Sequence, residues 1–109
     1  MAQMVVERQF DVFANPNIEG RRWRPFVVVI QSQFLAHFRT RVIVPLVPKT
    51  EIKPVARLNA VVTIGGKELF FHPVELAHIP TDLLRERVAN LDADRDRLVA
   101  AIDLVFTGI

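Results

Sequence analysis

The chain of 109 residues contains no cysteine. It can therefore form no disulfide bond, thiolate metal site or cysteine nucleophile, and this composition fits a reducing cytoplasm. It also lacks any run of about 18 consecutive apolar residues, the length that a membrane-spanning helix requires. Residues 1–8 lack the basic region and the apolar core of a cleaved signal peptide. We therefore predict a protein that neither spans a membrane nor is secreted through a cleaved signal.

A strong excess of charge is missing as well. Lys and Arg number 14 against 12 Asp and Glu, for a net charge of +2, so the basic pI of 9.7 is weak evidence for nucleic-acid binding. Half of the residues are hydrophobic, and the mean hydropathy is +0.24. Extra apolar surface on a small chain favours a two-fold dimer. We find no internal repeat or interdomain linker, which predicts one domain over residues 1–109.

Clusters of residues typical of catalysis are also absent from the sequence. The three histidines, His37, His72 and His78, lie in different segments, and none has a partner at a metal-ligand spacing. Gly65-Gly66 is typical of a turn, not of a phosphate-binding loop. Asp92 to Asp96 begins like a calcium loop but lacks its glycine and closing glutamate. These observations favour a binding module without cofactor or metal over an enzyme.

The apolar residues that are present predict mainly strands. Phe26–Ile30 is a short β-branched run typical of a central strand buried on both faces. Two glycines between apolar runs predict a tight hairpin. The expected elements are a first strand at Gln9–Val12, a strand at Arg39–Leu46 with Pro45 marking its end or an edge, a surface loop at Val47–Arg57, and a hairpin of 58–64 with 67–72.

The last eighteen residues predict one amphipathic helix. We expect Leu98, Ile102 and Val105 to face the core and Asp92 to cap the helix start. Gly108 is expected to end the helix in a left-handed conformation. The following Ile109 is expected either to pack back on the helix or to contact a partner. About five strands followed by a helix predict an antiparallel α+β domain, or a small barrel capped by the helix.

Three patches, in this order and spacing, resemble the CcdB family of plasmid-maintenance toxins. They are Val29-Ile30-Gln31-Ser32 leading to Val42-Ile43-Val44-Pro45-Leu46, then Val61-Val62-Thr63-Ile64-Gly65 with Ala77-His78-Ile79-Pro80, and finally Ala100–Phe106 before Thr107-Gly108-Ile109. The resemblance implies an SH3-like barrel shared with the MazF toxins and a homodimer in the bacterial cytoplasm. It also implies a non-enzymatic toxin that binds the A subunit of DNA gyrase, traps the gyrase–DNA cleavage complex and is neutralised by a CcdA-like antitoxin.

The resemblance also assigns site residues by position. The gyrase contacts would be Phe10, Ser32, Phe34, Leu35, Asp103, Thr107, Gly108 and Ile109. Thr107 stands where the best-known members carry tryptophan, and Asp103 stands where they carry asparagine. The first change removes a stacking surface, and the second adds a negative charge. The loops at 15–24 and 47–57 match the family poorly, so no antitoxin contact is assigned.

Two alternatives stay open. A MazF-like endoribonuclease on the same fold would hold RNA phosphates with Arg39 and Arg41 and with the loop arginines Arg21, Arg22 and Arg24. A diverged, non-toxic relative would keep the dimer and antitoxin binding only, and Thr107 is the reason to consider it. No sequence-specific nucleic-acid binding is expected from the gyrase poison itself.

Overall fold

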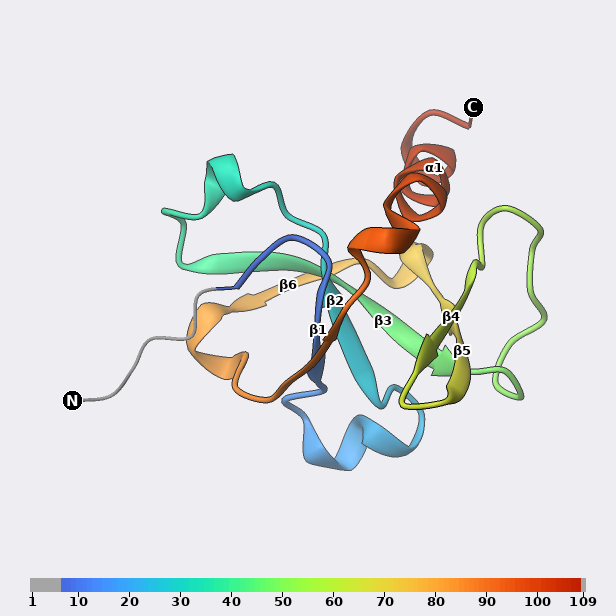
Figure 1. Cartoon of the computed structure of the whole chain (residues 1–109), viewed down its shortest axis with the longest axis horizontal. Helices are drawn as coiled ribbons and strands as arrows, with labels where there is room; N and C mark the ends of the chain where they lie inside the picture. The colour runs from blue at the N-terminus through green and yellow to red at the C-terminus, as the bar shows by residue number, and fades with distance from the viewer. Residues whose placement is uncertain (1–6, 109) are drawn as a thin grey trace.

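The computed structural model describes residues 7–108, which form one curled antiparallel sheet with a helix packed on it (Figure 1). The strand order is β4-β5-β3-β2-β1-β7, and β6 pairs with β3 off this path. The strands are β1 Asp11–Ala14, β2 Phe26–Val29, β3 Thr40–Pro48, β4 Val61–Ile64, β5 Lys67–Phe71, β6 Ala77–Pro80 and β7 Arg87–Asn90, and the helix is α1 Arg95–Phe106. The predicted α+β class with a small antiparallel barrel is confirmed, with two more strands in the described part than expected.

The long strand β3 connects the two halves of the sheet. One edge of β3 pairs with β2, while the other pairs first with β6 and then, from Leu46 on, with β5. Pro45 lies where the partner changes, and its carbonyl accepts the His72 amide at 3.1 Å on that side. The missing amide of Pro45 therefore faces the gap between β6 and β5, where a proline is tolerated. The prediction that Pro45 ends the strand or marks an edge is wrong.

The central strand β2 is buried on both faces, as its continuous apolar run predicts. Val28 aligns with Val12 of β1 and with Val44 of β3, and this row of three valines belongs to the larger core beneath the helix. The neighbouring Val27 and Val29 belong to a second, smaller core on the opposite face, together with Phe13, Ile43 and Leu84. Because side chains alternate along a strand, one short run contributes to both cores.

The predicted glycine hairpin is confirmed. Gly65 and Gly66 connect β4 to β5 with φ of +56° and +81°, the positive values that a tight two-residue turn requires at both positions. By contrast, β6 and β7 were not predicted, and β1 begins two residues later than expected. The strands β6 and β7 are short and largely exposed, so they lack the apolar alternation that reveals a strand.

The start of the helix differs from the prediction. A 3-10 turn at Asp92–Asp94 precedes α1, and Asp94, not Asp92, is the N-cap of the helix, without a side-chain capping bond. Asn90 Oδ1 accepts the Asp92 amide at 2.8 Å. The side chain of Asn90 thus satisfies a free amide at the beginning of the 3-10 turn.

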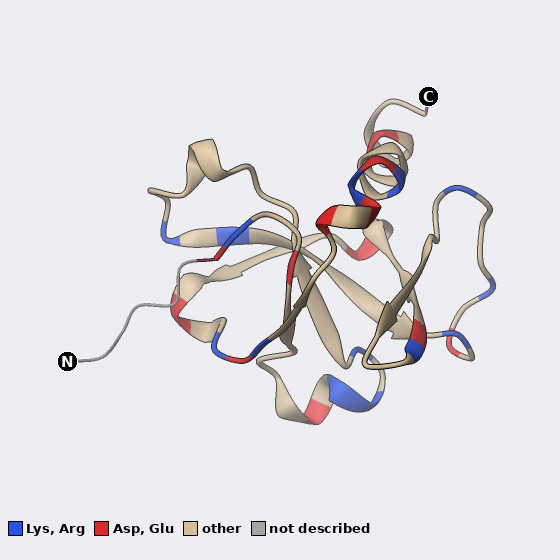
Figure 2. Cartoon of the chain, in the orientation of Figure 1, with Lys and Arg blue, Asp and Glu red and all other residues tan. Residues whose placement is uncertain are grey.

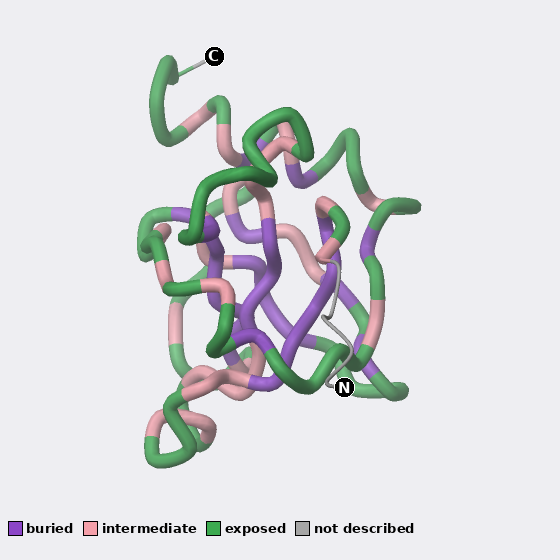
Figure 3. Tube along the Cα trace, turned by 90° about the vertical axis from the view of Figure 1, so that its left-hand side faces the viewer, coloured by how far each residue is buried: buried purple, intermediate pink, exposed green. Residues whose placement is uncertain are grey.

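The buried face of the helix is shorter than predicted. Leu98 and Ala101 are fully buried, and Ile102 packs against the same core from a half-buried position. Val105, however, is 37% exposed, so its assignment to the buried face is wrong. The helix runs beyond the sheet, and Figure 3 shows that its C-terminal end is exposed. The last turn of the helix therefore adds no buried residue to the core.

One ion pair links two distant loop segments. Arg24 Nε and Nη2 each donate to the Glu75 carboxylate at 2.6 Å, and the ring of His72 lies 3.6 Å from that carboxylate. The hydrogen bonds from Arg24 lower the pKa of Glu75 below its ordinary value and raise the pKa of Arg24. The pair thus fastens the loop before β2 to the 3-10 turn at Pro73–Glu75.

Replacing residues at successive positions along this face of the helix tests where its burial ends. We expect Leu98→Ala to lower the free energy of unfolding by about 2–5 kcal/mol, because the change leaves a cavity in the core. Val105→Ala should change it by less than about 1 kcal/mol, and Ile102→Ala should fall between. Urea unfolding measures all three, and equal losses for Leu98→Ala and Val105→Ala would contradict a buried face that ends before Val105.

The Arg24–Glu75 pair predicts a pH dependence of stability. Because the pKa of Glu75 is lower in the folded protein, the ionised carboxylate stabilises the fold above its ordinary pKa of 4.5 and loses this effect as the pH falls through the lowered value. We expect the advantage of the wild type over Glu75→Gln in urea unfolding to shrink in that acidic range. Arg24→Gln should remove the same pH-dependent part of the free energy of unfolding. If the two variants differ in how their unfolding free energy depends on pH, the Arg24–Glu75 pair is not the cause.

Candidate functional site

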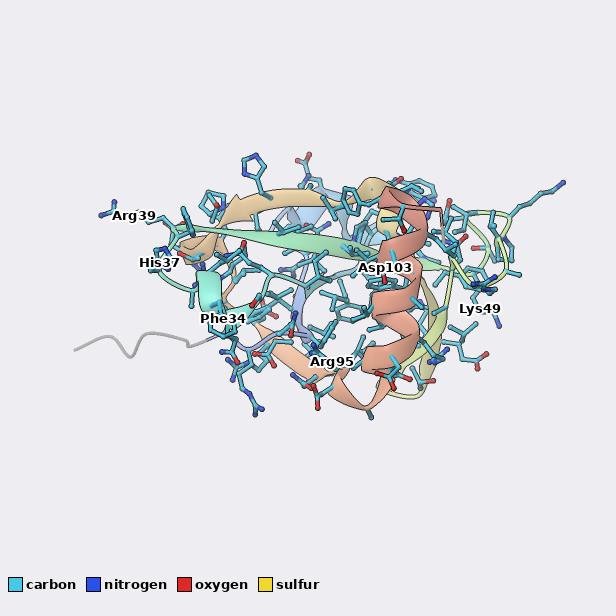
Figure 4. All side chains as sticks on the ribbon, turned by 90° about the horizontal axis from the view of Figure 1, so that it is seen from above. Phe34, His37, Arg39, Lys49, Arg95 and Asp103 are labelled. Carbon is cyan, nitrogen blue, oxygen red and sulfur yellow. The ribbon has the colours of Figure 1, made fainter. Side chains whose placement is uncertain are left out.

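Two exposed segments carry most of the predicted site residues. They are the loop of residues 32–39, between β2 and β3, and the end of α1 from Asp103 to Gly108. Both stand on the same side of the curled sheet in Figures 1 and 3, which we call the upper face. Figure 4 looks down on this face, with Phe34 on the loop and Asp103 on the helix. The predicted contact Ile109 lies outside the described residues.

The loop presents an unusually exposed aromatic side chain. Its 3-10 turn spans Gln33–Leu35, and Ser32 caps it by accepting the Phe34 amide on Oγ at 3.2 Å. Phe34 is 93% exposed. Leu35 and Phe38 are exposed as well. Ser32 therefore holds the backbone beside Phe34, and the loop offers apolar surface that the folded chain itself does not cover.

The end of α1 is closed by hydrogen bonds within the helix. Gly108 has a φ of +72° and donates its amide to the Leu104 carbonyl at 3.2 Å, which confirms the predicted left-handed helix end. Thr107 donates its hydroxyl to the Asp103 carbonyl at 2.7 Å, so this hydroxyl is engaged inside the helix. The Asp103 side chain itself is exposed.

Phe106 is a surface residue that the sequence prediction missed. It is not among the predicted contacts, and 67% of it is exposed. Its position follows from the helix running beyond the sheet, which leaves Val105 and Phe106 without a core to enter. A local apolar pattern shows which residues share a helix face, but it does not show where the neighbouring sheet ends.

Phe10 differs from the other predicted contacts because it is fully buried. Its backbone has a φ of +69°, which is rare for a bulky residue. Its amide donates to the Val29 carbonyl at 2.6 Å, and its carbonyl accepts the Leu91 amide at 2.8 Å. The guanidinium of Arg95 lies 5.2 Å from the centre of its ring. Phe10 thus presents no surface and instead supports the start of α1 from below.

A polar hollow lies between the loop and the start of the helix. It has a volume of about 460 Å³ and is lined by Gln9, Ser32, Gln33, Phe34 and Arg95. Arg95 Nη1 donates to Gln9 Oε1 at 2.8 Å, which ties the first turn of α1 to the segment before β1. Gln9, Gln33 and Arg95 were not predicted, because three segments distant in sequence bring them together.

The arginines of the ribonuclease alternative do not converge on one site. Arg41 is only 8% exposed, and its guanidinium is bound to backbone carbonyls of the loop. Arg24 is paired with Glu75, and Arg21 lies 3.6 Å from Glu86. Figure 2 shows the basic residues at the start of β3 and those of the 3-10 turn at Ile18–Arg22 in separate places. Arg39 is exposed, but the other four arginines do not gather beside it to form a phosphate-binding cluster.

In residues 7–108 no three His, Cys, Asp or Glu side chains are grouped so that they could hold a metal ion. None of the helices in the same range has the length and apolarity to cross a membrane.

The curled sheet with its C-terminal helix defines a small antiparallel α+β barrel, whose loop and helix end carry exposed apolar residues. A family model described as CcdB protein matches residues 9–108. The chain therefore belongs to the CcdB family, whose members are toxins of toxin–antitoxin systems. No curated protein matches the chain.

The left-handed helix end yields a test at Gly108. A Cβ added there meets open space, so the expected effect of Gly108→Ala comes from the backbone conformation alone. We expect it to lower the free energy of unfolding by about 1 kcal/mol, whereas Gly108→Asn, a residue that tolerates positive φ, should cost less. Urea unfolding of both variants checks this, and an Asn variant less stable than the Ala variant would contradict it.

Proposed function

We propose that this protein binds the A subunit of DNA gyrase through its upper face and traps the gyrase–DNA cleavage complex. The observation that carries the proposal is the 93% exposure of Phe34 on a capped loop, on the same face as the exposed end of α1. Membership of the CcdB family supports the choice of gyrase as the target. The protein acts by binding, with no covalent step of its own.

Aromatic side chains supply much of the energy at protein interfaces, because they bury a large rigid area at a small entropic cost. Thr107 offers no such surface, and its hydroxyl is already bonded to the Asp103 carbonyl. Phe106 directly precedes it and is well exposed. In our proposal Phe34 and Phe106 are the two aromatic anchors, which compensates for the missing tryptophan. Asp103 adds a carboxylate that suits a basic residue of the gyrase surface.

The remaining partners are part of the same proposal. The chain forms a homodimer, which the large apolar fraction of a small chain favours. A CcdA-like antitoxin binds the dimer and releases gyrase, and both act in the bacterial cytoplasm. The burial of Arg41 within the loop favours this function over RNA cleavage, because a guanidinium that is already bonded has few donors left for phosphate.

The first test is cleavage of supercoiled plasmid by gyrase in the presence of ATP and the purified protein, with detergent trapping of the covalent complex. We expect linear DNA only when the protein is present. Phe34→Ala and a variant truncated after Thr107 should lower cleavage at least tenfold, since each removes part of the binding surface. Ile18→Ala is the matched control, because Ile18 is also exposed but lies on the 3-10 turn at the opposite side of the sheet.

The outcomes separate the three functions. Linear DNA with the wild type and its loss in the Phe34 variant support gyrase poisoning. A folded dimer that causes no cleavage, yet still binds antitoxin, would favour the non-toxic relative. RNA cleavage by the pure protein, abolished by Arg39→Ala, would instead favour the endoribonuclease.

A further inference from the structure

The loop that carries Phe34 is held by a buried arginine. Arg41, on β3, donates from Nη1 to the Phe38 carbonyl at 2.6 Å and to the Thr40 carbonyl at 2.9 Å. Its Nη2 donates to the Ala36 carbonyl at 2.9 Å and lies 3.4 Å from Glu7 Oε2. One guanidinium therefore binds three carbonyls of the loop and the start of the strand, and a single carboxylate offsets its charge.

A second side chain holds the other end of the loop. Gln31, two residues after the end of β2, donates from Nε2 to the Leu35 carbonyl at 2.9 Å. Its Oε1 accepts the Val42 amide at 3.0 Å, so the same amide group connects β3 to the loop. Gln31 and Arg41 thus bind carbonyls on both sides of the loop's middle, and Ser32 fixes the turn between them.

These hydrogen bonds explain how such an exposed loop has a defined backbone conformation. A single 3-10 turn of three residues is too short to be stable by itself, and the residues from Gln33 to Arg39 are all exposed, so packing contributes little. Hydrogen bonds from a charged guanidinium are stronger than neutral ones, and burial of Arg41 strengthens them further. The loop is therefore held in place by hydrogen bonds from Gln31 and Arg41 to its backbone carbonyls.

We propose that Gln31 and Arg41 are positioning residues for gyrase binding, which hold the loop in its binding conformation before the encounter. Neither contacts the partner. They act through Phe34 and Leu35 by removing the entropic cost of ordering the loop on binding. This inference rests on the proposed function, since it needs a partner that uses Phe34.

The experiment uses the variants Arg41→Lys and Gln31→Ala in the full chain. Each is made alone and also together with Phe34→Ala. Lysine keeps the charge but loses the planar fork that reaches three carbonyls at once. Affinity for the gyrase A subunit is measured by calorimetry, and amide exchange of residues 33–39 is measured in the free protein. Arg39→Lys is the matched control, because Arg39 lies two residues away with its side chain exposed.

We expect each single variant to weaken binding about tenfold and to speed amide exchange in the loop, while Arg39→Lys changes neither. In the Phe34→Ala background the further loss should shrink to less than about threefold, because a positioning residue acts only through the side chain it positions. A merely structural role would give the same loss in both backgrounds. If Arg41→Lys does not fold, Gln31→Ala alone tests the positioning role by the same two measurements.

The results distinguish this inference from the proposed function. If the wild type binds and Phe34→Ala weakens it, but Gln31→Ala and Arg41→Lys bind as the wild type does, the positioning role is wrong and the function stands. Unchanged amide exchange in these variants would also overturn the positioning role. If the wild type itself does not bind the gyrase A subunit, the proposed function fails, and the inference fails with it.

Discussion

The structure depends on the antiparallel pairing of β3, which shares one edge with β2 and divides the other between β6 and β5. Strands twist with a fixed hand, and this sheet curls around the apolar residues beneath α1. Pro45 permits the change of partner because its missing amide faces the gap. The curl then brings Phe10 under the first turn of the helix, where its strained backbone bonds to both Val29 and Leu91.

The candidate site is assembled from this frame in two ways. The helix is fixed by packing, since Leu98 and Ala101 enter the core and leave the last turn exposed. The loop of residues 32–39 is fixed by hydrogen bonding, since it has almost no buried side chain of its own. Both are anchored to the same strands, so their separation across the upper face is set by the sheet. A binding surface built on a rigid frame loses less entropy on association.

The sequence was informative where a feature is local. The buried run of β2, the glycine hairpin and the left-handed Gly108 each follow from a few neighbouring residues and were predicted correctly. The missed features depend on distant partners. Asn90 at the end of β7 accepts the Asp92 amide, Val105 lies beyond the edge of the core, and β7 is a strand only because β1 offers it an edge. The same limit explains why Arg41 was considered for phosphate binding, although its donors are used by the loop.

The bonds from Gln31 and Arg41 reach carbonyl groups, which every residue type possesses. The path of the loop therefore does not depend on which side chains occupy positions 34, 35 and 38. Substitutions there alter the chemistry offered to a partner and leave the shape of the loop intact. In evolutionary terms, the loop can acquire a new target by changing its exposed residues one at a time, because the residues that determine its conformation lie outside the surface under selection.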